Sequence, residues 1–367
     1  EARQHRGAQV PAMSYRGGGR RGGSRSFSGG NRGGARGRGG QPWSNVGRGG
    51  RGGGPNSNVS LLTTLQGHSK SIRAIACSQE RQQLFSASQD GTVRIWGWPE
   101  GNFGQQGLLQ VGAAVNSIHV AGEYLIAGIG TQGQPNLVRL WNMQTNAQQD
   151  LAGHEGLVYA VTTGMDFLIT AGHDAGIRCW KMDPATTQFA LVGVLQGHTA
   201  PVQCLQVGGE MLFSAARDNT IKQWSLATGQ GVLSVTTQHT EFMTALLLHE
   251  TYVFSAGLDG KVIVYDVSKG LQPIFTHTVT DRNRQPSGVT AMIISSDAEG
   301  NAILVVGCND SALKLWEVPS FERRGLLLEH KQPCLTMCLG PGNSFFSAGM
   351  DTGIKVWEFQ DQSNGRR

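Results

Sequence analysis

Short runs of alternating apolar and polar residues fill most of this 367-residue chain from residue 59 onward. In the segment that ends at Trp96, Val93 and Ile95 alternate with more polar neighbours, which is the period of a half-buried β-strand. Asp90-Gly91 stands between two such runs, and Asp-Gly is a strong signal for a tight hairpin turn. The pattern therefore predicts antiparallel sheets of short strands.

The same unit recurs along the chain at a regular spacing. An Asp followed six positions later by an aromatic residue closes six units, at Asp90/Trp96, Asp174/Trp180, Asp218/Trp224, Asp259/Tyr265, Asp310/Trp316 and Asp351/Trp357. Trp141 closes a further unit without its Asp. Successive aromatic residues are 45, 39, 44, 41, 51 and 41 positions apart, and five units carry a His 20 to 22 residues before the Asp. A period near 40 residues indicates a repeat array.

The repeat also predicts how the units assemble. A four-stranded unit cannot cover its own apolar faces, so the units must pack on one another. We expect an all-β ring of seven blades over residues 59–360, which is 302 residues long. Residues 59–65 have no place in the first repeat, and we expect them to form the outer strand of the last blade. That strand would close the ring and remove its exposed edges.

These units resemble WD40 repeats, which open on Gly-His and close on the Asp-to-Trp pair. The resemblance implies a seven-bladed β-propeller in which His, Ser or Thr, Asp and Trp form a hydrogen-bonded tetrad in each blade. The matching sets are His68/Ser86/Asp90/Trp96, His154/Thr170/Asp174/Trp180, His198/Ser214/Asp218/Trp224 and His330/Ser347/Asp351/Trp357. The fifth unit has His239, Ser255 and Asp259 but Tyr265 in place of Trp. The sixth has Val306 at the hydroxyl position and no clear His, and the second keeps only Trp141.

Three segments carry a closer resemblance, residues 137–161, 308–325 and 340–357. They are similar to the propeller of the plant CCCH zinc-finger/WD40-repeat proteins. In that family Cys-Cys-Cys-His fingers precede the propeller and are expected to bind nucleic acid. No cysteine precedes Cys77, so residues 1–76 hold no finger. The resemblance implies zinc only if a finger lies before residue 1, and we expect no other cofactor.

Residues 1–58 differ from the rest of the chain in composition. They hold 19 of the 53 glycines and 11 arginines but a single acid, Glu1. Their net charge of +10 leaves −5 for the remainder of a chain whose total is +5. Such a segment buries too little apolar surface to offset its conformational entropy, so we expect a disordered tail. We expect residues 361–367 to be disordered as well.

The chemistry of this tail favours RNA binding. Guanidinium groups bind phosphates and stack on bases, and spaced aromatic residues stack on bases of any sequence. The candidate residues are the arginines of the six Arg-Gly-Gly motifs and three aromatic residues: Arg16, Arg21, Arg32, Arg38, Arg48, Arg51, Tyr15, Phe27 and Trp43. The alternative is that the tail is a spacer or contacts acidic proteins, and that the chain is purely a protein scaffold.

In propellers of this kind, peptides dock on the narrow top face around the central channel. The resemblance places there the residue before each tetrad Asp and the residue five beyond the repeat His. These are Arg73, Gln89, Tyr159, His173, Gln203, Arg217, Leu258, Asn309 and Met350. We therefore expect a protein partner at this face. The charged residues 281–288 are a candidate second contact surface. We expect a monomer.

Several other motifs are discounted. Residues 128–133 match the GxGxxG pattern, but another strand follows them instead of the helix that a dinucleotide site requires. Cys334 and Cys338 have no second pair at zinc spacing. The repeat itself supplies His, Ser and Asp throughout, so no catalytic set stands out and we expect no enzyme. No apolar stretch is long enough to span a membrane. The free cysteines and the Arg-Gly-Gly repeats favour an intracellular compartment, so we expect a protein of the nucleus, the cytoplasm or both. Asp297 is expected to lie in the loop SSDAEG, where its replacement by Ala should change stability by no more than about 0.5 kcal/mol.

Overall fold

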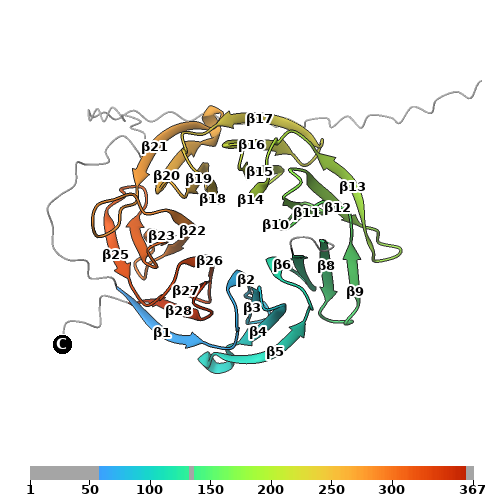
Figure 1. Cartoon of the computed structure of the whole chain (residues 1–367), viewed down its shortest axis with the longest axis horizontal. Helices are drawn as coiled ribbons and strands as arrows, with labels where there is room; N and C mark the ends of the chain where they lie inside the picture. The colour runs from blue at the N-terminus through green and yellow to red at the C-terminus, as the bar shows by residue number, and fades with distance from the viewer. Residues whose placement is uncertain (1–57, 132–135, 361–367) are drawn as a thin grey trace, which may run out of the picture. The chain divides into compact units, whose positions relative to one another are not determined.

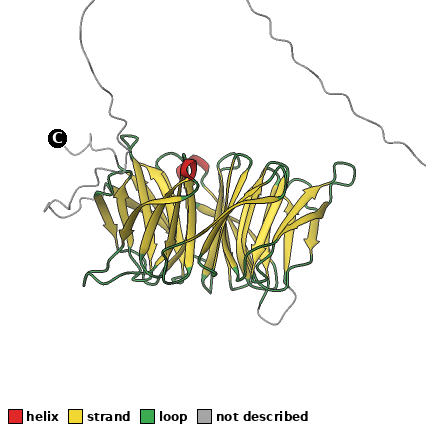
Figure 2. Ribbon diagram, turned by 90° about the horizontal axis from the view of Figure 1, so that it is seen from above, coloured by secondary structure: helices red, strands yellow, loops and turns green. Residues whose placement is uncertain are grey.

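In the computed structural model, residues 58–131 and 136–360 are described, and they form seven four-stranded antiparallel sheets around a central axis (Figure 1). Figure 2 shows the strands crossing the thickness of this ring. The predicted all-β, seven-bladed propeller is thereby confirmed. The predicted tail and C-terminal segment lie outside the described residues.

Six blades take four consecutive strands each, with the first strand innermost (Figure 1). Blades 1 and 2 consist of β2 (Ile72–Ser78), β3 (Gln83–Ser88), β4 (Thr92–Gly97), β5 (Gly104–Gln110), β6 (Val115–Ala121), β7 (Tyr124–Ile129), β8 (Leu137–Asn142) and β9 (Gln148–Leu151). Blades 3 and 4 consist of β10 (Val158–Gly164), β11 (Phe167–Gly172), β12 (Ile177–Met182), β13 (Phe189–Leu195), β14 (Val202–Gly208), β15 (Met211–Ala216), β16 (Thr220–Ser225) and β17 (Gln230–Thr236). Blades 5 and 6 consist of β18 (Met243–His249), β19 (Tyr252–Gly257), β20 (Lys261–Asp266), β21 (Gln272–Thr278), β22 (Val289–Ser296), β23 (Ala302–Cys308), β24 (Leu313–Glu317) and β25 (Arg323–Leu327). Two 3-10 turns, η1 (Pro99–Gly101) and η2 (Val267–Lys269), are the helical elements among the described residues.

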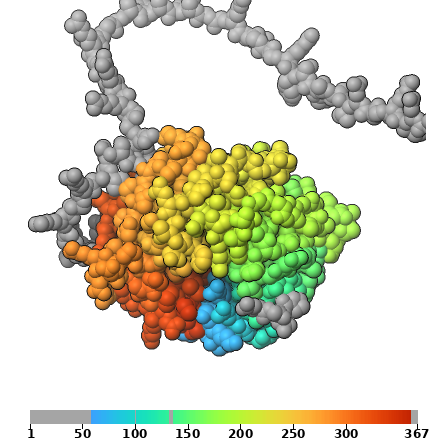
Figure 3. Space-filling view, turned by 45° about the horizontal axis from the view of Figure 1, so that its top comes forward, coloured from blue at the N-terminus to red at the C-terminus, as the bar shows by residue number. Residues whose placement is uncertain are grey.

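Blade 7 is assembled from both ends of the described chain. It consists of β26 (Cys334–Leu339), β27 (Ser344–Gly349), β28 (Ile354–Phe359) and, as its outer strand, β1 (Val59–Leu65). β1 runs antiparallel to β28, from Val59 opposite Phe359 to Leu65 opposite Ile354. Figure 3 shows the start of the described chain, in blue, beside the red last blade. Strand pairing between the two ends of the described chain therefore closes the ring.

Apolar clusters fill the seams between the blades. Along β3, Leu84 faces blade 7 and Phe85 faces blade 2, because neighbouring residues of a strand point to opposite faces of the sheet. At the closing seam, Trp98 and Phe103 each pack on Phe346 of β27 with ring centroids 5.9 Å apart. Each sheet thus buries both of its faces, which explains the dense apolar content of the second strand in each blade.

The tetrad side chains form a continuous hydrogen-bonded chain within a blade. In blade 1, His68 contacts Asp90 through Nδ1 at 2.8 Å and Ser86 through Nε2 at 2.8 Å. Trp96 Nε1 donates to the same Ser86 oxygen at 2.9 Å. A carboxylate can only accept, so Nδ1 carries the proton of the neutral ring, and the Ser86 hydroxyl donates to Nε2. The Asp90 carboxylate also accepts the Ser69 N–H at 3.0 Å. The turn before β4 is therefore fastened to the segment that leads into β2.

The structure brings the histidines and hydroxyl groups of the other predicted tetrads together in the same way. The joined pairs, at 2.7–2.8 Å, are His154 with Thr170, His198 with Ser214, and His330 with Ser347. In blade 5, His239 contacts Ser255 at 2.8 Å and Asp259 at 3.0 Å. The aromatic residue of that blade is Tyr265, and its burial raises the pKa of the phenol to about 12.

The indole groups of three further tetrads complete these networks. Trp180 Nε1 donates to the Thr170 hydroxyl at 2.9 Å, and Trp224 Nε1 donates to the Ser214 hydroxyl at 2.9 Å. Trp357 Nε1 donates to the Ser347 hydroxyl at 2.7 Å. Each indole N–H, the single donor of the Trp side chain, is thereby used inside the blade.

The two blades without a tetrad have connections of unusual length. Six residues link the outer strand to the next inner strand before β2, β10, β14, β18 and β26, which are the blades that carry the His. The connection is four residues before β6 and ten residues before β22. In blade 6, Asp310 is bound instead by the Lys314 Nζ atom at 2.6 Å. The His–Asp contact thus occurs in the blades where the connection before the inner strand is six residues long.

The sequence expectation for Asp297 was wrong. Asp297 is buried, and its carboxylate accepts the N–H groups of Glu299 and Asn301 at 3.1 and 2.7 Å. Arg324 also donates to it at 3.3 Å. An Asp side chain can hydrogen-bond the backbone of its own loop. In this turn, the loop backbone surrounds the Asp297 carboxylate that it hydrogen-bonds. Asp297 is therefore a structural residue and cannot serve as an inert control.

Loss of a tetrad carboxylate should destabilise the propeller. Asp218 accepts from His198 at 2.9 Å and from the Thr199 and Thr220 N–H groups at 3.0 Å, so Asp218→Ala leaves these donors unpaired. We expect a loss of about 1–3 kcal/mol in the free energy of unfolding, measured by urea denaturation. The matched control is Asp166→Ala, because the Asp166 side chain is 81 % exposed. Its effect should stay within about 0.5 kcal/mol. Equal losses in the two variants would contradict a structural role for the tetrad.

Acid should also destabilise the propeller. Desolvation lowers the pKa of His68 and His198, and contact with Asp90 and Asp218 offsets this only in part. Burial by itself raises the pKa of Asp90, but hydrogen bonds from Thr92, His68 and the Ser69 N–H outweigh it and bring its pKa to about 2. Both kinds of group bind more protons in the unfolded chain at acid pH. The free energy of unfolding should therefore fall as the pH drops from about 6.5 toward 2. A urea series at several pH values measures this slope, and a flat or rising profile would refute it.

Candidate protein-binding face

A β-bulge recurs at the same position in every blade. The pairing between the first and second strands shifts register around the second residue of the inner strand, as between Ile72 and Ala74 in blade 1. The residues at this position are Arg73, Asn116, Tyr159, Gln203, Thr244, Thr290 and Leu335. A bulge redirects a side chain out of the regular alternation. Three of the predicted top-face residues, Arg73, Tyr159 and Gln203, occupy it.

A second backbone contact holds the residue that precedes each tetrad Asp. Its N–H donates to the carbonyl of the residue just before the inner strand, as from Arg217 to Pro201 at 2.9 Å. The same bond joins Gln89 to Ser71, His173 to Leu157, Leu258 to Phe242, Asn309 to Gly288 and Met350 to Pro333, at 2.8–3.0 Å. In blade 2 the donor is Gly130, which has no side chain to offer. Repeated backbone geometry therefore brings the predicted residues to one face, here called the top-face ring.

Most of the top-face ring is accessible. Arg73, Gln89, His173, Arg217, Leu258, Asn309 and Met350 are exposed, and Tyr159 and Gln203 are half-buried. Leu258 and Met350 are 41 % and 44 % exposed, although both are apolar. Thr244 and Thr290, at the bulge of blades 5 and 6, instead donate to backbone carbonyls of the next blade, at Val289 and Cys334. Only some of the repeated positions are therefore available to a partner.

The tetrad tryptophans, which the resemblance gives as structural residues, do not belong to this accessible surface. Trp180, Trp224 and Trp357 are each buried, with 4 % of their surface or less exposed. Each lies in one of the apolar clusters, where it packs with residues of a neighbouring blade. A large apolar ring is stabilised by such burial, and its N–H already has a partner within the blade. These residues are therefore part of the core and cannot contact a partner.

A cationic and aromatic cluster lies on the top-face ring between blades 3 and 5. The Arg217 guanidinium carbon is 5.7 Å from the centre of the Tyr159 ring and 5.0 Å from that of Phe242. Phe242 is 44 % exposed. Sequence reasoning missed Phe242, but its place in the repeat could have revealed it, since it directly precedes β18. Apolar surface and guanidinium groups are the usual components of the centre of a protein interface.

Potential metal ligands and thiols are distributed over the blades of the described chain. They contain no group of three or more His, Cys, Asp or Glu side chains placed to hold a metal ion. All six cysteines are free, and burial raises the pKa of Cys77 and Cys179 to about 11, which disfavours the reactive thiolate. Gly128 lies in β7, and the next element among the described residues is the strand β8, not the helix that a dinucleotide site requires. No helix among the described residues has the length and apolar character to span a membrane.

The predicted RNA-binding residues, from Tyr15 to Arg51, lie outside the described residues. Their role stays a prediction from the sequence.

Comparisons with known proteins agree with the repeat and with the fold. The family model described as WD domain, G-beta repeat matches residues 59–97 and 189–225. Zinc finger CCCH domain-containing protein 17 of Oryza sativa subsp. japonica is 30% identical over 305 residues, which cover 83% of this chain and 67% of that protein. Zinc finger CCCH domain-containing protein 48 of Arabidopsis thaliana is 34% identical over 307 residues, covering 83% and 68%. Zinc finger CCCH domain-containing protein 62 of the same plant is 30% identical over 303 residues, covering 82% and 70%. The chain belongs to the plant CCCH zinc-finger proteins that carry a WD40-repeat propeller.

Proposed function

We propose that this chain is a non-catalytic adaptor whose propeller binds a protein partner at the top-face ring. The observation that supports this most strongly is the exposed cluster of Tyr159, Arg217 and Phe242. The backbone beside these residues is held by strand pairing and by the repeated loop hydrogen bonds, so little conformational entropy is lost when a peptide docks. The exposed Leu258, which directly follows β19, adds apolar area on the Phe242 side.

The chemistry of the cluster suggests what part of a partner it accepts. Arg217 already rests against two aromatic rings, which fixes the direction of its guanidinium. A carboxylate or backbone carbonyl of a peptide would accept its N–H groups, and an apolar side chain would cover Phe242 and Leu258. We therefore propose an extended peptide segment that places an acidic or carbonyl group beside an apolar residue.

The second half of the proposal concerns the arginine- and glycine-rich tail. Its six Arg-Gly-Gly motifs and its spaced aromatic residues suit single-stranded RNA, as the sequence predicts. The tail would hold RNA while the propeller holds a protein, inside the nucleus, the cytoplasm or both. The free cysteines fit such a reducing compartment. The alternative is a pure protein scaffold in which nucleic-acid binding belongs to a zinc finger outside this chain.

Arg217→Ala should weaken peptide binding at the top face. Peptides selected from a random display library against the full chain provide the probe, and isothermal titration measures their affinity. A central arginine in contact with aromatic residues is a typical hot spot, so we expect a loss of about 2 kcal/mol, or roughly thirtyfold. Lys181→Ala is the control, since Lys181 lies 5.7 Å from the Phe167 ring outside the top-face ring. If selected peptides tolerate Arg217→Ala as well as Lys181→Ala, the top-face site is refuted.

Removal of residues 1–58 should abolish RNA binding. The full chain should bind a single-stranded oligouridylate in fluorescence anisotropy, with log K falling against log salt at about −0.7 per phosphate contacted. Replacement of Tyr15, Phe27 and Trp43 by Ala should cost about 1–3 kcal/mol for each base that is no longer stacked. Equal affinity with and without the tail would disprove its RNA-binding role and leave the scaffold alternative.

A further inference from the structure

A pocket lies beside the long connection into blade 6. In five blades the repeat His stands four residues before the inner strand, and in blade 6 this position holds Gln285, which is exposed. Without the imidazole, the Asp310 side chain is 27 % exposed, whereas the tetrad aspartates are 4–9 % exposed. The pocket, of about 920 Å³, lies between the ten-residue connection and β25.

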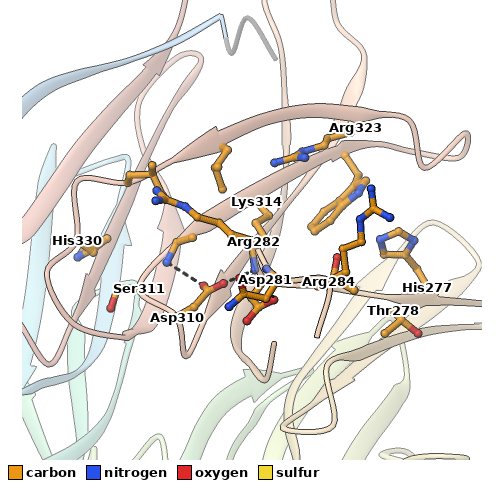
Figure 4. Close-up of a pocket in the computed structure, with 16 residues that line it drawn as sticks. His277, Thr278, Asp281, Arg282, Arg284, Asp310, Ser311, Lys314, Arg323 and His330 are labelled. Carbon is orange, nitrogen blue, oxygen red and sulfur yellow. Dashed lines mark hydrogen bonds and ion pairs between the residues drawn. The ribbon is translucent and has the colours of Figure 1, made fainter. Parts of the chain in front are cut away.

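Among the charged side chains that line this pocket, basic groups outnumber acidic ones. Arg282 and Arg284 come from the connection, Arg323 from β25, and Lys314 from β24. Figure 4 shows these side chains around one space, with His277 and His330 at its opposite ends. The acidic groups that line it are Asp281 and Asp310. The pocket thus carries four basic groups against two acidic ones.

Both acidic groups are already engaged. Asp281 Oδ1 accepts the N–H groups of Asn283 and Gln285 at 2.8 and 2.9 Å and thereby shapes the connection. Asp310 Oδ2 is bound by Lys314 at 2.6 Å. Within the described part of the chain, Arg282, Arg284 and Arg323 form no ion pair, and all three are exposed. Three guanidinium groups therefore remain to bind an anion.

We propose that this pocket binds a phosphorylated serine or threonine in an extended segment of a partner protein. Three guanidinium groups from two chain segments suit a doubly charged phosphate, whose oxygens accept paired N–H bonds. Leu326 and the exposed Leu328 line the same pocket and offer apolar area to a neighbouring peptide residue. Phosphorylation of the partner would then control docking at this pocket, which borders the top-face ring at blade 6, where Ser287 of the connection donates to Asn309 at 3.1 Å.

The surroundings favour a phosphopeptide over RNA. The described residues carry 18 Lys and Arg against 24 Asp and Glu, a net charge of −6, so the basic pocket is a local exception on an acidic propeller. A nucleic-acid backbone needs an extended basic surface, whereas one phosphate group does not. The aromatic groups of the pocket are also occupied. His277 packs on Trp316 with ring centroids 5.0 Å apart, and Trp316 is only 6 % exposed, so neither presents a free face for a base.

The test compares binding of phosphorylated and unphosphorylated peptides by the full chain. The probe is a fluorescent pool of random nine-residue peptides centred on phosphoserine or phosphothreonine, and its partner is the same pool without phosphate. Fluorescence anisotropy should show preferential binding of the phosphorylated pool and competition by inorganic phosphate. The variant Arg282→Gln/Arg284→Gln/Arg323→Gln should bind that pool at least about tenfold more weakly. All three side chains are exposed, so its melting temperature should match that of the unaltered chain.

A charge-matched variant controls for the general loss of positive charge. Arg81→Gln/Lys181→Gln/Lys269→Gln removes three basic groups that do not line the pocket, and it should keep the full affinity. Equal binding of the two pools, or equal effects of the two variants, would overturn the proposal. Titration of the same variants with oligouridylate tests RNA as the alternative occupant of the pocket. If the pocket variant loses RNA and not the phosphorylated pool, the pocket is an RNA site and the peptide proposal is wrong.

Discussion

A buried carboxylate needs hydrogen-bond donors, and this need governs the geometry of the propeller. In five blades a histidine from the connection before the inner strand supplies one donor, and backbone N–H groups of the same connection supply others. The carboxylate itself stands at the turn between the second and third strands. Each contact thus joins two loops that are about 20 residues apart, at the same end of the blade. The residues of the top-face ring lie next to these contacts along the chain. The structural tetrads therefore also orient the candidate binding surface.

The departures from the repeat are as informative as its copies. A connection of six residues accompanies every His–Asp contact, and connections of four and ten residues accompany its loss. In blade 6 the loss opens space, and Lys314 takes over the carboxylate that the His would have bound. In blade 2, which has no tetrad, Arg139 pairs with Asp150 at 2.6 Å across the third and fourth strands. The ring tolerates both changes because each blade is also held by apolar seams with its two neighbours.

Two surfaces of different character result from this arrangement. The top-face ring combines aromatic, apolar and cationic groups on rigid backbone, as Arg217 between Tyr159 and Phe242 illustrates. The pocket of blade 6 is instead a confined basic site on an acidic propeller. An adaptor can use two such surfaces for two partners, or for two segments of one partner, and the latter would gain affinity through effective concentration.

The sequence by itself determined the repeat, the number of blades and the closing strand, because hydrophobic period and spacing are properties of the chain, and it identified the tetrads through the family pattern. It also placed nine residues on the top face through the family pattern. Tertiary structure alone decided what those residues contact. Phe242 joined the ring because its blade lies next to that of Arg217, and Asp297 proved buried because its own loop and Arg324 enclose it. The blade 6 pocket likewise depends on tertiary structure. Its arginines come from two segments about 40 residues apart, and only the packing of β25 beside the long connection brings their charges together.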